Sequence, residues 1–233
     1  MLAQTMNAVN HMDWSNGVVF VTGASRGIGA AFGKMAASLG ARVILASRSV
    51  DAPSHDRLSG SLMDVKNDID RVGGSAHIIH LDTRDDARIS AVANEIVARW
   101  GRLDLLVNNA SAIDLRQHPP VEVADLVHSV NTRGTMLLNQ AFLPVLKESD
   151  GQILTISPPL EDWQTWSRVA PAYVASKYGM TLHTIGLAHE VKANCLWPKR
   201  TIATAATRML ERNTGVAYHS KGRSPSYFAQ ALG

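Results

Sequence analysis

Short apolar runs alternate along this chain with longer stretches in which apolar residues recur at helical spacing. Apolar runs bounded by turn residues and separated by helical patterns are typical of βαβ units, which form parallel sheets. The sequence therefore predicts an α/β fold, a doubly wound parallel sheet with helices on both faces. The expected strands are Gly17 to Thr22, Arg42 to Ala46, His77 to Leu81, Leu103 to Asn108, Gln152 to Ser157 and Val191 to Leu196.

No linker in this pattern is long enough to divide the chain into domains. With 233 residues, of which 45% are hydrophobic, the chain can bury the core of one domain. We expect an N-terminal extension over residues 1–16 and one domain over residues 17–233. Residues 200–233 are irregular and rich in small and polar side chains, and they are expected to form a mobile lid over a substrate.

A glycine-rich turn follows the first expected strand and precedes a helical pattern. It reads Thr22-Gly23-Ala24-Ser25-Arg26-Gly27-Ile28-Gly29, with spacing Gly-x-x-x-Gly-x-Gly. Glycines let a backbone approach phosphate groups closely, and the free amides at a helix start attract anions. The order of strand, turn and helix predicts a dinucleotide site in a Rossmann-type sheet. The alternative interpretation of the same residues is a tight turn between strand and helix without a binding role.

Tyr173 and Lys177 lie four residues apart in Tyr-Val-Ala-Ser-Lys, on an expected helix from Pro171 to Glu190. Residues at this spacing share one face of a helix, so the Lys177 ammonium is expected near the Tyr173 phenol. A neighbouring positive charge favours the ionised phenol and lowers its pKa. The pair is therefore a candidate proton donor and acceptor, and its alternative reading is a solvated helix face.

Two further segments complete a set of four motifs. Leu105-Leu106-Val107-Asn108-Asn109-Ala110-Ser111 ends an expected strand, and Asn131-Thr132-Arg133-Gly134 interrupts the helical stretch Val121 to Lys147. With all four motifs the chain resembles the short-chain dehydrogenases/reductases from about Gly17 to Arg212. Three other segments resemble the hydroxysteroid-dehydrogenase-like branch of that family, namely Ile156-Ser157-Pro158-Pro159, Tyr178-Gly179-Met180 and Leu196-Trp197-Pro198-Lys199.

The resemblance assigns roles to the candidate catalytic residues, which are Asn131, Ser157, Tyr173 and Lys177. Tyr173 would exchange a proton with the substrate oxygen, while hydride passes between the substrate carbon and a nicotinamide. Lys177 would lower the pKa of Tyr173 and hold the nicotinamide ribose. Asn131 would anchor a water of a proton relay, or would be a plain polar residue that interrupts a helix.

The resemblance also implies the cofactor-binding residues. Asn109 and Ala110 would line the nucleotide, Asp82 would contact adenine or cap a turn, and Ile202 and Thr204 would reach the carboxamide and phosphates. The full set is Gly23, Ser25, Arg26, Gly27, Ile28, Gly29, Ser47, Arg48, Asp82, Asn109, Ala110, Tyr173, Lys177, Pro198, Ile202 and Thr204.

The end of the second expected strand favours NADP over NAD. An acidic residue there would bind the ribose hydroxyls of NAD and repel the extra phosphate of NADP, but the chain has Ala46-Ser47-Arg48. Arg48 and Arg26 have the guanidinium geometry that suits a 2′-phosphate. In the alternative interpretation both arginines are solvated on the surface, and the Asp51 side chain turns back to bind the ribose.

One position departs from the family's pattern. Two serines usually end the fifth strand, and the second polarises the substrate carbonyl. Here Ser157 matches the first, and Pro158, which offers no donor, occupies the second. Ser157 could take over this role if the strand end twists; otherwise a backbone amide or a water must donate the hydrogen bond.

Apolar candidates for a substrate pocket are Leu160, Trp163, Trp166, Trp197 and Met209. They suggest an NADP-dependent oxidoreductase that interconverts an apolar ketone or aldehyde and its alcohol. The second interpretation is an enoyl- or dienoyl-thioester reductase, whose activity would depend less on the missing serine. A non-catalytic nucleotide-binding scaffold is the third reading, which the intact Asn131, Tyr173 and Lys177 disfavour.

Charge and cysteine content limit the kinds of partner and of covalent link that the protein can have. A formal net charge of +3, with scattered basic residues, does not indicate a nucleic-acid surface. Cys195 is the sole cysteine, so an internal disulfide is excluded. The pattern predicts no metal site, no membrane span and a cytoplasmic protein. The resemblance implies a homodimer or homotetramer through the helices Val121 to Lys147 and Pro171 to Glu190.

The expected helix ending at Glu190 runs directly into the strand that begins at Val191. Helix-to-strand connections need about 2 to 6 residues. We therefore expect residues to be missing between Ala188 and Ala193, and again in the region Arg212 to Gly233, where no final strand follows Tyr227 to Leu232. The alternative at the first position is a helix that ends early.

Overall fold

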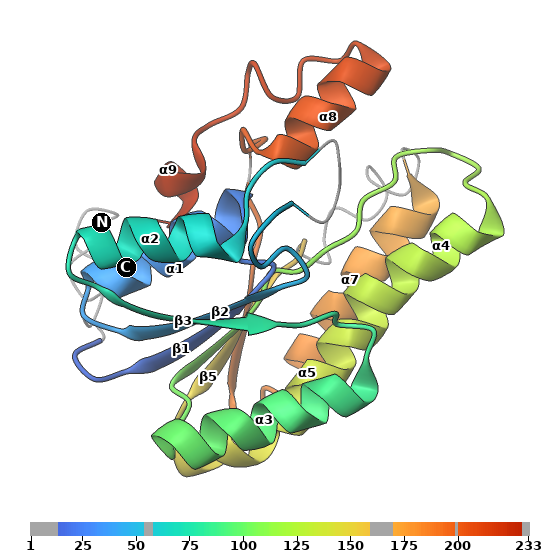
Figure 1. The fold of residues 1–233 in the computed structure, drawn as a ribbon. Helices are drawn as coiled ribbons and strands as arrows, with labels where there is room; N and C mark the ends of the chain where they lie inside the picture. Colours follow the sequence, from blue (N-terminus) through green and yellow to red (C-terminus); the bar gives the residue numbers. More distant parts are fainter. Residues whose placement is uncertain (1–13, 54–57, 159–169, 199, 230–233) are drawn as a thin grey trace, which may run out of the picture.

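Residues 14–53, 58–158, 170–198 and 200–229 are described by the computed structural model of this chain. Its six strands form one parallel sheet in the order β3-β2-β1-β4-β5-β6 (Figure 1). All six expected strands are confirmed, with ends that shift by at most two residues. Their bounds are β1 Val18–Thr22, β2 Arg42–Ser47, β3 Ser75–His80, β4 Leu105–Asn108, β5 Gln152–Ile156 and β6 Lys192–Leu196.

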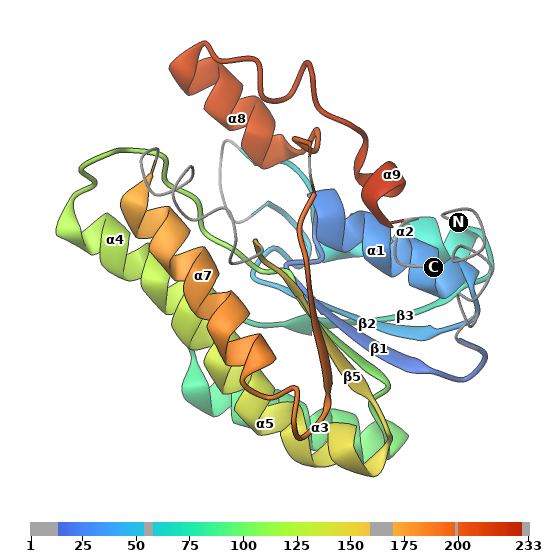
Figure 2. The ribbon, with the colours of Figure 1, turned by 180° about the vertical axis from the view of Figure 1, so that it is seen from behind.

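Helices cover both faces of this sheet, as predicted (Figures 1 and 2). Helices α1 Gly27–Ser38 and α2 Leu62–Arg71 lie on one face. The other face carries α3 Asp86–Trp100, α4 Val121–His128, α5 Gly134–Glu148 and α7 Pro171–Ile185. Helix α8 Ala205–Thr214 rises above the sheet, and α9 Pro225–Ala229 packs against α1.

The strands alternate their side chains between two apolar cores. Phe20 and Ile44 pack toward α3 and α5, where the ring of Phe20 lies 5.0 Å from that of Phe142. Val21 and Leu45 pack toward α1 and α2. Burial on both faces explains why β1 and β2 are continuous apolar runs in the sequence rather than alternating ones.

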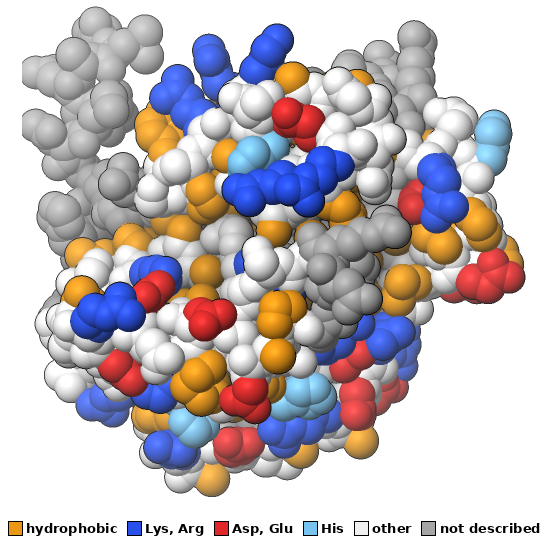
Figure 3. All heavy atoms as spheres, turned by 45° about the horizontal axis from the view of Figure 1, so that its top comes forward, with side chains coloured by type: hydrophobic (Ala, Val, Ile, Leu, Met, Phe, Trp, Pro, Cys, Tyr) orange, Lys and Arg blue, Asp and Glu red, His pale blue; other side chains and the backbone are white. Residues whose placement is uncertain are grey.

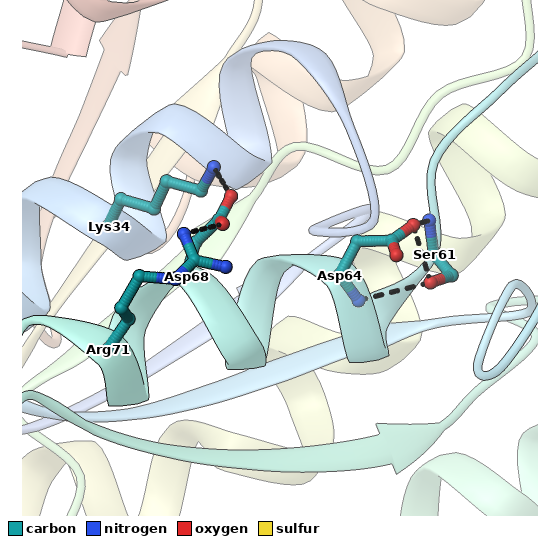
Figure 4. Close-up of polar contacts among 5 residues, drawn as sticks. All are labelled: Lys34, Ser61, Asp64, Asp68 and Arg71. Carbon is teal, nitrogen blue, oxygen red and sulfur yellow. Dashed lines mark hydrogen bonds and ion pairs between the residues drawn. The ribbon is translucent and has the colours of Figure 1, made fainter.

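Helix α2 has a capping box at its start and ion pairs at Asp68, further along the helix (Figure 4). The Ser61 side chain accepts a hydrogen bond from the Asp64 amide at 3.1 Å, and the Asp64 carboxylate accepts one from the Ser61 amide at 3.0 Å. This capping box satisfies two free amides of the first turn. Asp68 pairs with Lys34 of α1 at 2.5 Å and with Arg71 at 2.9 Å, but exposed pairs of this kind add little stability.

The expected omission of residues between Ala188 and Ala193 is wrong, because α7 ends five residues earlier than expected, at Ile185. The following residues form hydrogen-bonded turns, including Leu187 N to Thr184 O at 3.1 Å and Val191 N to Leu187 O at 3.0 Å. Gly186 to Val191 thus supply the connection to β6. Within the described part of the chain β6 is the last strand, and it forms an edge of the sheet.

Candidate functional site

The glycine turn joins β1 to α1 at the carboxyl end of the sheet. Gly23 and Gly27 have φ values of +66° and +58°, in the left-handed region that favours glycine. A Cβ on Gly29 would lie 2.4 Å from Asn109 Nδ2, so a larger residue would not fit there. Helix α1 begins at Gly27 with no acidic residue in its first turn and no cap from a described side chain. Its first amides therefore face an open position suited to an anion.

Asn109 holds the β4 loop against this turn. Its Nδ2 donates to the Thr22 carbonyl at 2.9 Å and to the Gly23 carbonyl at 3.2 Å. The amides of Asn109 and Ala110 both donate to Thr22 Oγ1, at 3.1 and 3.2 Å. The predicted nucleotide-lining residues thus meet the glycine turn. Asn108 instead serves the sheet, as expected, with its Nδ2 2.7 Å from Asn139 Oδ1.

The segment after β6 returns to the same turn. Ile202 is buried and packs with Ile28 and with Ile156 of β5. A Cβ on Gly27 would lie 3.3 Å from Thr204 Cγ2, so Thr204 lies beside the start of α1. Thr204 also caps α8 through a capping box with Thr207. The structure therefore brings Ile202 and Thr204 to the predicted phosphate site, and Pro198 lies partly buried just after β6.

Two arginines lie at the end of β2. The Arg26 guanidinium donates to the Leu58 carbonyl at 2.6 Å and to Ser49 Oγ at 2.7 Å, while Arg48 is exposed. Burial lowers the pKa of Arg26, and the positive charge of Arg48 lowers it further. Ser47 Oγ accepts from the Ser49 amide at 3.0 Å, which shapes the turn between them. An anion between the two guanidinium groups would relieve their repulsion.

Asp82 follows β3 and contacts a neighbouring arginine. Its carboxylate accepts from Arg84 Nη2 at 2.6 Å and from the Arg84 amide at 3.0 Å. The hydrogen bond from the Arg84 side chain is the largest cause of its lowered pKa. This geometry is that of the turn-capping alternative, and adenine contact by Asp82 stays a prediction.

Tyr173 and Lys177 are both carried by α7. Burial raises the pKa of Tyr173 to about 12, and a hydrogen bond with the Ser111 side chain opposes this rise. Burial lowers the pKa of Lys177 to about 7, and the charge of Cys195 opposes that shift. Lys177 Nζ donates to the Ile156 carbonyl at 2.6 Å and lies 3.2 Å from Met180 Sδ.

The prediction that Lys177 lowers the pKa of Tyr173 is therefore wrong for this structure. The Lys177 ammonium is drawn into the interior toward the last carbonyl of β5, and it is not among the groups that shift the pKa of the phenol. Burial dominates instead, because it disfavours the charged form of each group and so moves their pKa values in opposite directions. At neutral pH Tyr173 carries its proton.

Asn131 is fully buried in the short π-helical segment η1 Ser129–Arg133, which separates α4 from α5. Its Oδ1 accepts from the Ala112 amide at 2.8 Å, and its Nδ2 donates to the Ala112 carbonyl at 2.9 Å and to Ser176 Oγ at 2.9 Å. The expected helix irregularity is thus confirmed, and π segments are frequent at functional sites. Asn131 joins the β4 loop to α7, one turn from Tyr173.

Ser157 is buried directly after β5. It is 1% exposed, and the Thr181 hydroxyl contacts its Oγ at 2.9 Å and the Pro158 carbonyl at 2.8 Å. Both atoms are thereby engaged by α7 in the interior. Of the apolar pocket candidates, Trp197 and Met209 are partly buried, whereas Leu160, Trp163 and Trp166 lie outside the described residues.

Three residues of this region were not among the sequence candidates. The Ser111 side chain opposes the rise in the pKa of Tyr173. Ser176 Oγ accepts from the Asn131 amide group and donates to the Tyr173 carbonyl at 2.7 Å, and Thr181 contacts Ser157. Ser111 directly follows the Asn-Asn-Ala motif, and Ser176 is one turn from Tyr173, so motif adjacency was an available signal. No local signal pairs Thr181 with Ser157, because they are far apart in the sequence.

The residues around the glycine turn have the features of a dinucleotide site. The glycine turn, the open start of α1, and Thr204 meet at one place, with two guanidinium groups beside it. Figure 3 turns the α8 end of the molecule toward the reader and shows Lys and Arg side chains gathered there. Within the described ranges no cluster of metal-ligating side chains occurs. None of the described helices is long and apolar enough to cross a membrane.

Known proteins share both this sequence and this architecture. The family model for short chain dehydrogenase matches residues 17–210. Hydroxysteroid dehydrogenase-like protein 2 of Homo sapiens is 43% identical over 199 residues, which are 82% of this chain and 47% of that protein. This chain therefore spans about half the length of the curated relatives it matches.

Solved structures extend the comparison to the fold. A putative dehydrogenase from Xanthomonas campestris is 37% identical, has a TM-score of 0.86, and matches 95% of this chain and 82% of its own. A metagenomic short-chain oxidoreductase in complex with NADP is 30% identical, with a TM-score of 0.70 and coverage of 94% and 90%. The chain belongs to the short chain dehydrogenase family, a family of NAD(P)-dependent oxidoreductases, and to its hydroxysteroid-dehydrogenase-like branch.

Proposed function

We propose that this protein is an NADP-dependent oxidoreductase that interconverts an apolar ketone or aldehyde and the corresponding alcohol. The observation that carries the proposal is the way in which Tyr173 is tied to the β4 loop. Ser176 Oγ donates to the Tyr173 carbonyl at 2.7 Å and accepts from Asn131 Nδ2 at 2.9 Å, and Asn131 Oδ1 accepts from the Ala112 amide of that loop at 2.8 Å. Burial raises the pKa of Tyr173 to about 12, so its phenol keeps its proton at neutral pH. A protonated phenol at this place is a proton donor for a substrate oxygen.

NADP, when bound, supplies or accepts the hydride. The amides of the glycine turn and of the α1 start would hold its pyrophosphate, and Ile202 and Thr204 lie beside that position. Asp82, Asn109 and Ala110 line the adenosine side. These residues place the reacting atoms and exclude water from them.

The catalytic residues then move and hold one proton. Tyr173 donates it to the substrate oxygen in the reductive direction and accepts it in the oxidative direction. Lys177 would hold the nicotinamide ribose; in this structure its Nζ donates to the Ile156 carbonyl. Asn131 keeps the β4 loop and α7 in register, so that the phenol faces the substrate.

NADP is proposed over NAD because two guanidinium groups, those of Arg26 and Arg48, lie at the end of β2. The pKa of Arg26 is lowered by burial and then by Arg48, which shows that the two positive charges are close. A 2′-phosphate bound there would pair with both. Some solved relatives were crystallised with NADP, including the metagenomic oxidoreductase.

The substrate is proposed to be apolar because two partly buried apolar side chains, Trp197 just after β6 and Met209 in α8, flank the segment that carries Ile202 and Thr204. A thioester reductase is the second candidate, favoured by one observation: Pro158, just after β5, has no hydroxyl at the position where the family pattern has its second serine, and Ser157 is buried. A carbon-carbon double bond needs less polarisation of an oxygen by such a donor.

The test is oxidation of NADPH and of NADH by the full chain with three probes, acetophenone, decanal and trans-2-decenoyl-CoA. Turnover of the ketone or aldehyde with NADPH is the expected result. Turnover of the thioester alone assigns the second candidate. Tight NADPH binding, measured by calorimetry, without turnover of any probe would contradict both and indicate a nucleotide-binding scaffold.

A further inference from the structure

Basic side chains gather on α8 and on residues 215–229, which return from α8 to α1. Between residues 200 and 229 every lysine and arginine is exposed, and Glu211 is the one carboxylate. Figure 3 shows Lys and Arg side chains together on this face of the molecule. We refer to them as the α8 basic face, which consists of Arg200, Arg208, Arg212, Lys221 and Arg223.

The α8 basic face lacks carboxylate partners. Within the described part of the chain none of its side chains forms an ion pair. Other exposed arginines lie 2.5 to 2.9 Å from a carboxylate oxygen, namely Arg71, Arg84, Arg102 and Arg116. The Glu211 carboxylate accepts from the amides of His219 and Ser220, at 2.5 and 2.8 Å. The described residues therefore leave this positive charge without a partner.

His219 connects the α8 basic face to the predicted phosphate site. Its Nδ1 donates to the Thr204 carbonyl at 3.1 Å, which leaves Nε2 to accept from Arg208 Nη2 at 3.2 Å. Thr204 lies beside Gly27 at the start of α1. Arg208 is thereby held close to the nucleotide turn, and its other N–H groups remain for an anion.

Helix α8 also has an apolar side. Leu210 is 8% exposed and Met209 is partly buried, whereas Arg208 and Arg212, which lie one turn apart, are exposed. A ligand bound along this helix would meet apolar side chains on the inner side and cations on the outer side. This combination fits a molecule with an apolar chain at one end and phosphates at the other.

We propose that the α8 basic face binds the phosphates of coenzyme A, and that the substrate is the coenzyme A thioester of an apolar acyl chain. The proposal rests on the proposed function and names the substrate class of the same site. The 3′-phosphate and diphosphate of coenzyme A carry about four negative charges at neutral pH, which guanidinium and ammonium groups bind by charge-assisted hydrogen bonds.

Both candidate reactions have substrates of this class. A 3-oxoacyl thioester is an apolar ketone, and a 2-enoyl thioester is the substrate of the second candidate. Neither reaction breaks the thioester bond, so coenzyme A contributes binding and takes no part in the chemistry. Binding through a remote part of the substrate helps to place its reacting atoms.

A membrane surface and a nucleic acid fit this face less well. A helix that lies in a membrane interface presents large apolar side chains to the lipid beside its cations. The large apolar side chains of α8, Met209 and Leu210, are instead partly or fully buried. A nucleic-acid duplex is bound by basic side chains along an extended stripe, whereas these cations lie on one short helix and the segments beside it.

Calorimetry on the full chain saturated with NADPH tests this binding without turnover, because the cofactor site is then filled. The probes are decanoyl-CoA, which has neither a ketone nor a double bond, and decanoyl-pantetheine, which lacks the phosphates. Decanoyl-CoA should bind at least about tenfold more tightly. Arg208→Gln combined with Arg212→Gln should remove this difference and leave the affinities for decanoyl-pantetheine and NADPH unchanged.

Two further variants separate phosphate binding from net charge and from folding. Arg71→Gln combined with Arg102→Gln makes the same charge change at arginines that have carboxylate partners, and it should keep the difference between the probes. Arg212→Gln combined with Lys221→Gln alters side chains that form no ion pair with a described residue. This variant should stay folded and weaken decanoyl-CoA binding alone.

Equal affinity for the two probes, or a difference that both α8 variants retain, overturns the inference even if the wild-type chain reduces acetophenone or decanal. Binding to vesicles of phosphatidylcholine and phosphatidylserine, or to a duplex oligonucleotide, that both variants lose while the two probes bind equally would assign the face to a membrane or a nucleic acid instead. Expected binding of decanoyl-CoA by a chain that turns over no probe supports the phosphate site and contradicts the proposed function.

Discussion

Asn131 pairs its side-chain amide with both backbone polar groups of Ala112, accepting from the amide at 2.8 Å and donating to the carbonyl at 2.9 Å. This is the pairing that a neighbouring strand would offer, yet it comes from a π-helical segment. The β4 loop is therefore bound to the helical layer and not only to the sheet. Because the Asn131 amide also reaches Ser176, one buried residue fixes two parts of the site.

Asn131→Leu should destabilise the chain and disorder the site together. Three hydrogen bonds are lost, and burial of unpaired backbone groups costs about 1 to 3 kcal/mol each. We expect the free energy of unfolding in urea to fall by about 3 kcal/mol. The exposed Gln140→Leu on α5 is the control and should shift the midpoint little. Equal midpoints for the two variants would contradict the role given to Asn131.

Tyr173→Phe removes one hydroxyl and leaves the packing of α7 intact. NADPH affinity should be nearly unchanged, while kcat should fall by about 10²-fold or more, because the proton donor is lost. Steady-state kinetics on the probe that the wild-type chain turns over, with calorimetry for the cofactor, measure both quantities. Retention of more than about a tenth of the activity would remove Tyr173 from the mechanism.

Lys177 should make stability depend on pH. Burial lowers its pKa from 10.5 to about 7, so between these values the unfolded chain binds a proton that the folded chain releases. Stability should then rise with pH across this window by about 1.4 kcal/mol per pH unit, whereas below about pH 7 the whole cost of burying the charge is present.

Lys177→Met removes the titrating group and keeps the side-chain length. The free energy of unfolding of the wild-type chain, minus that of this variant, should increase from pH 7 to pH 9.5. Urea denaturation measures both values. Limiting the range avoids ionisation of Tyr173 in the unfolded state. A constant difference across the window would mean that Lys177 stays protonated when buried.

Arg48→Asp should exchange the cofactor preference. Arg48 is exposed near Arg26, so a carboxylate in its place would repel a 2′-phosphate and leave the ribose hydroxyls of NAD accessible. NADPH affinity should fall by at least tenfold and NADH affinity should be kept. Arg99→Asp, at the far end of α3, is the control for the change in net charge. A preference of the wild-type chain for NADH would contradict the interpretation that the end of β2 selects NADP.

Assembly should proceed through α4, α5 and α7. Val121 and Leu126 of α4 and Leu182 and Ile185 of α7 are large apolar side chains that remain exposed in the single chain, with Leu182 56% exposed. We expect a homodimer or homotetramer by light scattering, and dissociation on Leu126→Glu combined with Leu182→Glu. The exposed Val72→Glu on the opposite face is the control. A wild-type monomer at micromolar concentration would contradict the prediction.

The sequence by itself determined the architecture. Strands buried on both faces must be apolar throughout, and helices beside them must show helical spacing, so β1 to β6 could be located from local patterns. The glycine turn could also be predicted from the sequence. Gly23 and Gly27 have a left-handed backbone, and Asn109 closely approaches Gly29, so other residues are excluded at these positions. The pattern ran too far at α7, which stops at Ile185, and it missed α8 and α9 within residues 200–233, which were expected to be irregular.

The tertiary structure decided the directions of the side chains and the electrostatics of the site. Helical spacing put Tyr173 and Lys177 on one face, but burial set their pKa values, and the carbonyl of Ile156 drew the lysine inward. The contacts of Asn131 with Ser176 and of Thr181 with Ser157 join residues distant in the chain. Such contacts depend on desolvation and on which polar groups meet after packing, and neither is encoded in a local pattern.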